Sequence, residues 1–146
     1  MKKLTKNYAF IDGSFNPATK IYGCGGFLID QIGKKHIIQA NGNDPAMAKM
    51  RNVAGEILGA MKAVELAQEL GMKKLTIFHD YEGVAAWPLG KWKCKKQETR
   101  KYAMAIWAAM ELGLKIYFSH VKGHSGIDGN EEADQLAKLA VGLEVK

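Results

Sequence analysis

The segment Val121-Lys122-Gly123-His124-Ser125-Gly126-Ile127-Asp128-Gly129-Asn130-Glu131-Glu132-Ala133-Asp134 begins like a strand, breaks into a glycine-rich loop and resumes as a helix. Glycine adds no apolar surface to a core and loses the most backbone entropy on folding, so this loop favours a functional role. His124 falls on the loop and Asp134 on the helix, ten residues apart. The alternative is a surface helix after a turn, with Asn130 as its cap and acids suited to its first turn.

Three further acids follow apolar strands or lie on an apolar helix face. Asp12 ends an alternating segment that starts at Tyr8, and Asp80 ends another that starts at Leu75, whereas Glu56 lies among small residues of a helical segment. A buried carboxylate without a partner is costly, so each acid requires a cation, hydrogen bonds or a position at the edge of the core. Two alternatives remain open: Glu56 as a partly solvated side chain, and Asp80 as the cap of a helix that starts at Tyr81.

In their order along the chain, these residues resemble type 1 ribonuclease H. The matching residues are Asp12-Gly13-Ser14, Glu56 in its small-residue helix, Asp80 after an apolar strand, and Lys122-Gly123-His124-Ser125-Gly126 followed by Asn130-Glu131 and Asp134. The resemblance covers almost the whole chain. It implies one catalytic domain over residues 1–146, of the stand-alone bacterial type, with the α/β fold of the ribonuclease H family.

Composition limits the other possibilities. The chain has 146 residues, enough for one ordinary domain, and Lys plus Arg exceed Asp plus Glu by 21 to 15, for a net charge of +6. This basic balance favours a polyanionic partner. Cys24 and Cys94 lack metal-ligand spacing and are expected as free thiols in a reducing cytosol, with a single bridge between them as the alternative. No long apolar run indicates a signal peptide or a membrane span, so we expect a soluble cytoplasmic protein.

The hydrophobic pattern predicts an α/β fold with a five-stranded mixed sheet flanked by helices. Strands are expected over residues 7–12, 21–30, 36–40, 74–80 and 116–121, with a turn over residues 15–20. Helices are expected over residues 46–70, from 81 to Pro88, and over residues 98–112 and 130–141. The first three strands, which are close in sequence, form an antiparallel meander, and the later strands run parallel through helical crossovers.

Acids from distant parts of the chain suit the hydrolysis of a phosphodiester. This reaction requires a deprotonated water and neutralisation of charge on the attacking and leaving oxygens, which two divalent metals about 4 Å apart supply. Mg²⁺ prefers carboxylate oxygens, and no zinc-type cluster or phosphate-binding glycine loop competes with this interpretation. The resemblance implies Mg²⁺, with Mn²⁺ as a substitute, as the cofactor. It implies Asp12, Glu56, Asp80 and Asp134 as metal ligands and His124 as a catalytic residue for proton transfer or product departure.

The resemblance implies an RNA/DNA hybrid as substrate. Such hybrids are recognised by groove shape and by 2′-hydroxyl groups. Backbone and side-chain groups of Gly13, Ser14 and Asn16, together with Asn52, are expected to contact it. Val53 stands where the family often has a second asparagine, and Glu82 stands where it often has an amide, which indicates a divergent branch.

A basic loop is the second candidate for substrate binding. Lys91, Lys93, Lys95 and Lys96 surround Trp92, and Trp87 lies just before them. Lysine releases counterions from phosphates and an aromatic ring can pack on a sugar or base, so this loop is predicted to hold the DNA strand. The alternative is a solubilising loop whose tryptophans fold back onto the core.

The predicted function is therefore a metal-dependent endoribonuclease that cuts the RNA strand of RNA/DNA hybrids and leaves 5′-phosphate and 3′-hydroxyl ends. Two alternatives are a DNA-cutting nuclease of the same fold and an inert hybrid-binding module. The four acids favour the enzyme over the inert module. We expect a monomer that requires no protein partner.

Overall fold

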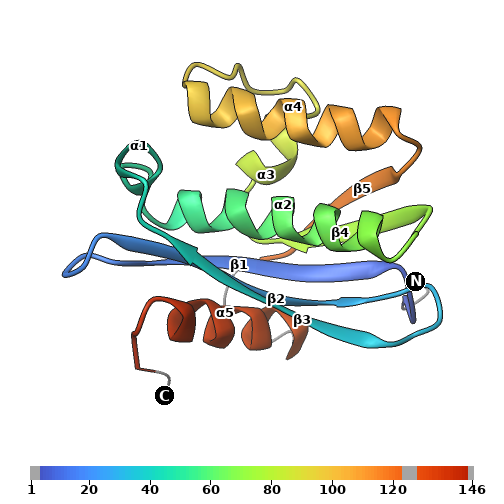
Figure 1. Ribbon diagram of the computed structural model, residues 1–146, viewed down its shortest axis with the longest axis horizontal. Coiled ribbons are helices and arrows are strands. Elements are labelled where there is room, and N and C mark those ends of the chain that lie inside the picture. The colour runs from blue at the N-terminus through green and yellow to red at the C-terminus, as the bar shows by residue number, and fades with distance from the viewer. Residues whose placement is uncertain (1–3, 123–127, 145–146) are drawn as a thin grey trace.

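A five-stranded mixed sheet runs through the centre of the molecule, here described by a computed structural model over residues 4–122 and 128–144 (Figure 1). Its order is β3-β2-β1-β4-β5. The first three strands pair antiparallel, whereas β1 with β4 and β4 with β5 pair parallel. The strands are β1 (Tyr8–Asn16), β2 (Ile21–Ile29), β3 (Lys35–Gly42), β4 (Lys74–His79) and β5 (Lys115–His120). The predicted sheet is thus confirmed in its strand number, order of appearance and directions.

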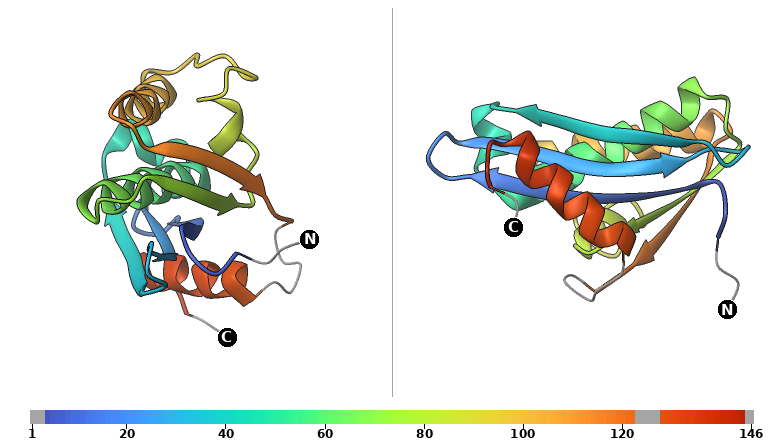
Figure 2. Two further views of the ribbon diagram at one scale, coloured as in Figure 1. Left: turned by 90° about the vertical axis from the view of Figure 1, so that its right-hand side faces the viewer. Right: turned by 90° about the horizontal axis from the view of Figure 1, so that it is seen from below.

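Helices cover both faces of the sheet and make three layers (Figure 2). On one face lies α2 (Asn52–Glu69), with α3 (Gly83–Ala86) and α4 (Gln97–Glu111) beyond it. On the other face α5 (Asp128–Ala140) packs against β1, β2 and β3. The main core lies between the sheet and α2, where Ile11, Ile57 and Ile77 are almost fully buried.

Glycines let the helices approach the sheet closely. A Cβ at Gly13 in β1 would overlap the carbonyl oxygen of Asn52 and the amide of Glu56. A Cβ at Gly25 in β2 would overlap backbone atoms of α5 on the opposite face. The missing side chains therefore set the depth at which α2 and α5 sit, and with it the position of Glu56 relative to β1.

The single helix predicted over residues 46–70 is wrong, because the chain forms a short α1 (Pro45–Ala48) before α2. Arg51 separates the two helices with a backbone φ of 55°, a value outside the right-handed helical region. Its guanidinium carbon lies 4.8 Å from the centre of the Phe15 ring. Helix propensity does not predict this break, which coincides with a contact between Arg51 and the ring of a residue in β1.

Several other boundaries differ from the prediction, and two of them bear on the site. β1 continues through Asn16, so the predicted turn over residues 15–20 starts too early: Phe15 pairs with Tyr22, and both side chains are buried against Ala54. The short helix α3 starts at Gly83 and has Glu82 as its N-cap residue, not Asp80. Asp80 is therefore not the N-cap of this helix, which the sequence left open as an alternative.

Cys24 and Cys94 are both free thiols, which confirms the prediction. Cys24 is fully buried in β2, and burial raises its pKa to about 11, so its thiol is held protonated and inert at neutral pH. Across residues 4–122 and 128–144, none of the helices has the length and apolar character needed to cross a lipid bilayer.

Candidate metal centre

Asp12 and Asp80 lie close together because each follows the segment in which β1 pairs with β4. β1 and β4 pair from Tyr8↔Thr76 to Phe10↔Phe78. Each aspartate lies two residues beyond the last of these pairs, and side chains two residues apart lie on the same face of a strand. Both carboxylates therefore lie on one face, just beyond the paired segment of β1 and β4: Asp80 follows the last residue of β4, whereas β1 continues past Asp12, paired with β2.

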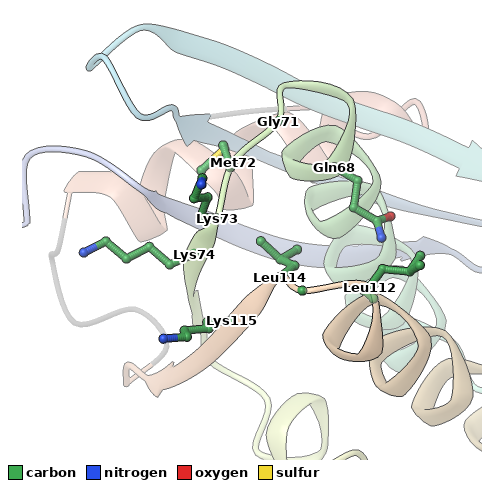
Figure 3. A pocket seen from close by; sticks show the side chains of 10 residues that line it. Gln68, Gly71, Met72, Lys73, Lys74, Leu112, Leu114 and Lys115 are labelled. Atoms are coloured by element: carbon green, nitrogen blue, oxygen red, sulfur yellow. The ribbon is translucent and has the colours of Figure 1, made fainter.

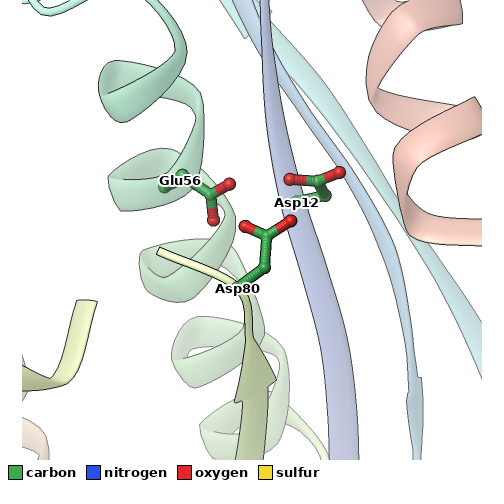
Figure 4. Close-up of side chains that lie close together, drawn as sticks. All are labelled: Asp12, Glu56 and Asp80. Carbon is green, nitrogen blue, oxygen red and sulfur yellow. The ribbon is translucent and has the colours of Figure 1, made fainter. Parts of the chain in front are cut away.

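Glu56 joins them from α2, to form the carboxylate cluster of Asp12, Glu56 and Asp80 (Figure 4). One ligand oxygen of each of these three residues lies within 4.8 Å of the others. The Gly13 amide donates to Asp12 Oδ1 at 2.9 Å and to Glu56 Oε1 at 3.1 Å. Because Gly13 has no side chain, α2 can pack closely on β1, and the Gly13 N–H donates to two of the three acids.

Burial makes the charged cluster unfavourable without a cation. Asp12 and Glu56 are 6% and 4% exposed. Loss of solvent raises the pKa of Asp12 from 3.8 to about 7, with the charge of Asp80 adding to the rise. Burial also holds the pKa of Glu56 well above its usual range, together with repulsion from Asp12 and Asp80. Glu56 Oε2 is buried without a hydrogen-bond partner among the described residues.

Asp134, the fourth predicted acid, lies on α5 and is not one of the three residues of the cluster. Its carboxyl group contributes a side-chain interaction to the raised pKa of Asp12. It also forms an ion pair with Lys138 one turn later, with 3.0 Å between Nζ and Oδ2. The sequence reasoning did not include Lys138, although the spacing of four residues is the usual signal for such a pair on a helix. His124 lies outside the described residues.

The residues predicted to contact substrate have different surroundings. Ser14 is buried in β1, whereas Asn52 is exposed at the start of α2. The Asn16 side chain is used within the fold: its Nδ2 donates to the Val141 carbonyl at 2.9 Å, and its Oδ1 accepts from the Ala18 amide at 3.1 Å. Asn16 therefore ties the end of β1 to the chain just after α5.

The basic loop lies next to Tyr81, the residue that follows Asp80. Trp87 packs against the core, and its ring centre lies 5.6 Å from that of Trp92, which is 37% exposed. Both indoles also contact the Tyr81 ring. Trp87 thus folds back onto the core, as the alternative interpretation of the loop expected. The four lysines of the loop are exposed. Three of these lysines, Lys93, Lys95 and Lys96, line a hollow of about 310 Å³ whose other walls include Tyr81 and Trp87.

Two histidines beside the cluster were also absent from the sequence reasoning. The imidazole of His79 bonds to the Tyr81 carbonyl at 2.9 Å, and that of His120 bonds to the Asp80 carbonyl at 2.8 Å. Both histidines lie at the ends of strands that were predicted to run parallel, and only the observed pairing of β4 with β5 brings them together.

The raised pKa of Asp12 makes a testable prediction about stability. An acid whose pKa is higher in the folded state stabilises the protein at low pH, and this stabilisation is lost as pH rises through the folded value. In EDTA we expect the free energy of unfolding to fall by about 4 kcal/mol between pH 4 and pH 8 owing to Asp12, at 1.36 kcal/mol per pH unit between its ordinary pKa of 3.8 and its folded value of about 7. Urea unfolding at a series of pH values measures the decline.

The matched control is Asp12→Asn, which lacks the titrating group. Burial lowers the pKa of His79, which opposes the decline in both proteins and cancels in their difference. Mg²⁺ should stabilise the unmodified protein more at pH 8 than at pH 5, since ligands bind once deprotonated. A difference between the two proteins that does not vary with pH would contradict the assignment.

The fold and the cluster define an α/β protein with a carboxylate site of the kind that holds divalent cations. Comparison with known proteins then gives the family. The family model for RNase H matches residues 5–142. The chain belongs to the RNase H family.

Individual relatives found by sequence comparison are named ribonuclease H or H1. Ribonuclease H1 from Homo sapiens is 34% identical over 100 residues, which cover 62% of this chain and 35% of the human protein. Ribonuclease H from Nitrobacter hamburgensis is 30% identical over 97 residues, which cover 60% of this chain and 64% of that protein. This chain therefore matches about a third of the human relative's length.

Solved structures show the same fold. The crystal structure of RNase H1 from Halobacterium salinarum superposes with a TM-score of 0.73 at 20% identity, over 91% of this chain and 95% of that one. The structure of LC11-RNase H1 in complex with an RNA/DNA hybrid has a TM-score of 0.70 at 16% identity and covers 91% of this chain and 97% of that one. At these identities the likeness establishes the fold, including the predicted ribonuclease H-like architecture.

Proposed function

We propose that this protein is a metal-dependent endoribonuclease that hydrolyses the RNA strand of RNA/DNA hybrids and leaves 5′-phosphate and 3′-hydroxyl ends. The observation that carries the proposal is the convergence of Asp12, Glu56 and Asp80 within 4.8 Å in a chain of the RNase H family. The names of the relatives and the hybrid bound by a structural neighbour support the choice of substrate.

The donor set fits Mg²⁺ or Mn²⁺. All the proposed ligands, Asp12, Glu56, Asp80 and Asp134, offer carboxylate oxygens, which hard divalent cations prefer. Among the described residues Glu56 Oε2 has no hydrogen-bond partner, and the pKa values of Asp12 and Glu56 are raised; a positive charge would stabilise all of these groups in their charged form. A bound pair of such cations lowers the pKa of water and neutralises charge on the attacking and leaving oxygens.

The chain's own groups would prepare the site for this chemistry. The Gly13 amide holds one oxygen of Asp12 and one of Glu56, which directs their other oxygens. Lys138 forms an ion pair with Asp134 and restricts its side chain. We assign proton transfer or help with product departure to His124, because an imidazole titrates near neutral pH.

A cleavage assay on matched 20-mers tests the proposal. RNA/DNA hybrid, duplex RNA and duplex DNA of one sequence are incubated with the protein in Mg²⁺, in Mn²⁺ and in excess EDTA. We expect internal cuts in the RNA of the hybrid alone, in the presence of metal alone. Equal cutting of duplex DNA would favour a DNA-cutting nuclease, and binding without cleavage would favour an inert module.

We further propose that hybrid lies across the carboxylate cluster, with Gly13, Ser14, Asn16 and Asn52 on the RNA side and the basic loop (residues 91–96) and Trp87 on the DNA side. The loop's exposed lysines and the aromatic wall of its hollow support this placement. Phosphate contacts give sequence-independent affinity that depends on salt.

A triple lysine variant tests the role of the basic loop. Replacing Lys93, Lys95 and Lys96 with alanine should raise KM for hybrid and flatten its salt dependence by up to about three units of slope, with kcat little changed, because uniform binding is lost. Steady-state kinetics between 50 and 200 mM salt, the range in which phosphate contacts weaken markedly, measure both quantities.

The matched control is a second group of three lysines at the opposite end of the sheet. Lys73, Lys74 and Lys115 line a hollow of about 650 Å³ at the amino ends of β4 and β5 (Figure 3). Their replacement with alanine removes the same net charge far from the cluster and should change KM much less. Equal effects of the two triple variants would mean that net charge, and not the basic loop, governs binding.

A further inference from the structure

The backbone that presents Asp80 lies outside regular secondary structure. Asp12 belongs to β1 and pairs with Gly25 of β2, and Glu56 lies within α2. β4 instead ends at His79, one residue before Asp80, and α3 starts only at Gly83. Of the three acids in the cluster, Asp80 therefore has the least backbone support from helices or strands.

The β4–β5 ladder supplies its last amide just before this point. The final register pair is His79↔His120, and the Val121 amide donates to the His79 carbonyl at 2.7 Å. The next carbonyl belongs to Asp80. The imidazole of His120 holds this carbonyl from outside the ladder, since its Nε2 lies 2.8 Å from the Asp80 carbonyl oxygen.

A second imidazole holds the following peptide. His79, which is 1% exposed, has its Nδ1 2.9 Å from the Tyr81 carbonyl oxygen. A carbonyl oxygen only accepts hydrogen bonds, so Nδ1 of His79 and Nε2 of His120 are the protonated nitrogens. The two rings lie side by side, with 5.6 Å between their centres. Two successive carbonyls, those of Asp80 and Tyr81, are thus held by neighbouring side chains.

His79 is buried and has a structural role as well, whereas His120 is exposed and belongs to the last position of β5. The bond of His120 to the Asp80 carbonyl restricts rotation of the peptide that follows the aspartate. The Asp80 carboxylate points toward Asp12 and Glu56 (Figure 4), so the peptide that His120 holds adjoins the side chain that completes the cluster.

We propose that His120 is a positioning residue for Asp80, and that its hydrogen bond to the Asp80 carbonyl sets the affinity of the carboxylate cluster for divalent cations. This inference rests on the proposed function, in which Asp80 is a metal ligand. Residues that orient metal ligands typically contribute about 10- to 100-fold to metal affinity, and this range gives the size of the expected effect.

Mn²⁺ binding to the whole chain tests the inference, by titration calorimetry and by electron paramagnetic resonance of free Mn²⁺. His120→Leu removes the donor and should weaken Mn²⁺ binding by about 10- to 100-fold, with a parallel rise in the Mn²⁺ concentration needed for half-maximal cleavage. His120→Gln keeps an N–H donor at a similar reach and should recover most of the affinity. Thermal unfolding in EDTA should change little, since His120 is exposed.

Tyr117→Leu is the matched control, because Tyr117 is a 54% exposed residue of the same strand whose side chain lies on the opposite face. It should bind Mn²⁺ as the unmodified protein does. Unchanged affinity in His120→Leu, or equal losses in His120→Leu and His120→Gln, would overturn the inference. Failure of the unmodified protein to bind Mn²⁺ would instead contradict the proposed function.

Discussion

Asp12→Asn and Asp80→Asn are each expected to lower hybrid cleavage in Mg²⁺ by more than about 1,000-fold. Each substitution replaces a charged ligand oxygen with a neutral amide of the same size, so metal binding weakens without a cavity. A loss of several kcal/mol of charge stabilisation in the transition state corresponds to a factor of this size, at 1.36 kcal/mol per tenfold. Single-turnover cleavage of labelled hybrid measures the loss.

The same two variants should be at least as stable as the unmodified protein in EDTA at pH 8, because each removes a repelling charge from the cluster. This second measurement separates loss of a ligand from loss of the fold. Glu82→Gln is the matched control: Glu82 is exposed two residues after Asp80 and lies outside the cluster, so activity should persist. Near-normal cleavage by either aspartate variant at low Mg²⁺ would exclude that residue as a ligand.

Gly55→Ala is expected to have the largest effect on stability. A Cβ at Gly55 would overlap the Gly23 carbonyl oxygen and lie 2.8 Å from Gly13 Cα and 2.9 Å from the Ser14 amide. All three neighbours are backbone atoms of paired strands, which cannot rotate away as a side chain does. Because overpacking a core typically costs 1–3 kcal/mol when the surroundings relax, we expect a loss of at least about 3 kcal/mol in urea unfolding.

Gly59→Ala, one helical turn later, is the matched control. Its Cβ would lie 3.2 Å from Cys24 Cβ and 3.3 Å from Ile11 Cβ, a tight approach to side chains that small shifts relieve. Alanine also favours a helix over glycine by about 1 kcal/mol, so the net change should be small. If Gly55→Ala were tolerated as well as Gly59→Ala, α2 could not be held against the sheet as closely as described.

Much of the fold was predictable because local patterns and tertiary structure agree. Alternating segments such as Tyr8 to Asp12 predicted strands, and the short turns between the first three strands predicted antiparallel pairing. The errors lie where residues that are distant in sequence are in contact. Arg51 leaves the helical region as its guanidinium packs on Phe15, and no pattern within residues 46–70 contains that information.

The sequence predicted which acids form the site but not how they are arranged in space. The order of Asp12, Glu56, Asp80 and Asp134 along the chain identified the candidates, since acids at strand ends and on small-residue faces are unusual. The sequence could not show that the Gly13 amide joins Asp12 to Glu56, or that His120 reaches the Asp80 carbonyl. These contacts join residues 40 or more positions apart.

The sequence by itself therefore determined the fold class, the basic charge and the identity of the acids, because each follows from residue type and from periodicity over a few neighbouring positions. Only the tertiary structure decided how the acids are used. The pairing of β1 with β4 ends at Phe10↔Phe78. Gly13 and Gly55 allow α2 to lie close to the sheet. As a result, oxygens of three carboxylates lie within 4.8 Å of one another, in surroundings that raise the pKa values of Asp12 and Glu56. Burial and repulsion depend on distances in space, and these distances exist only once the sheet and its helices have packed.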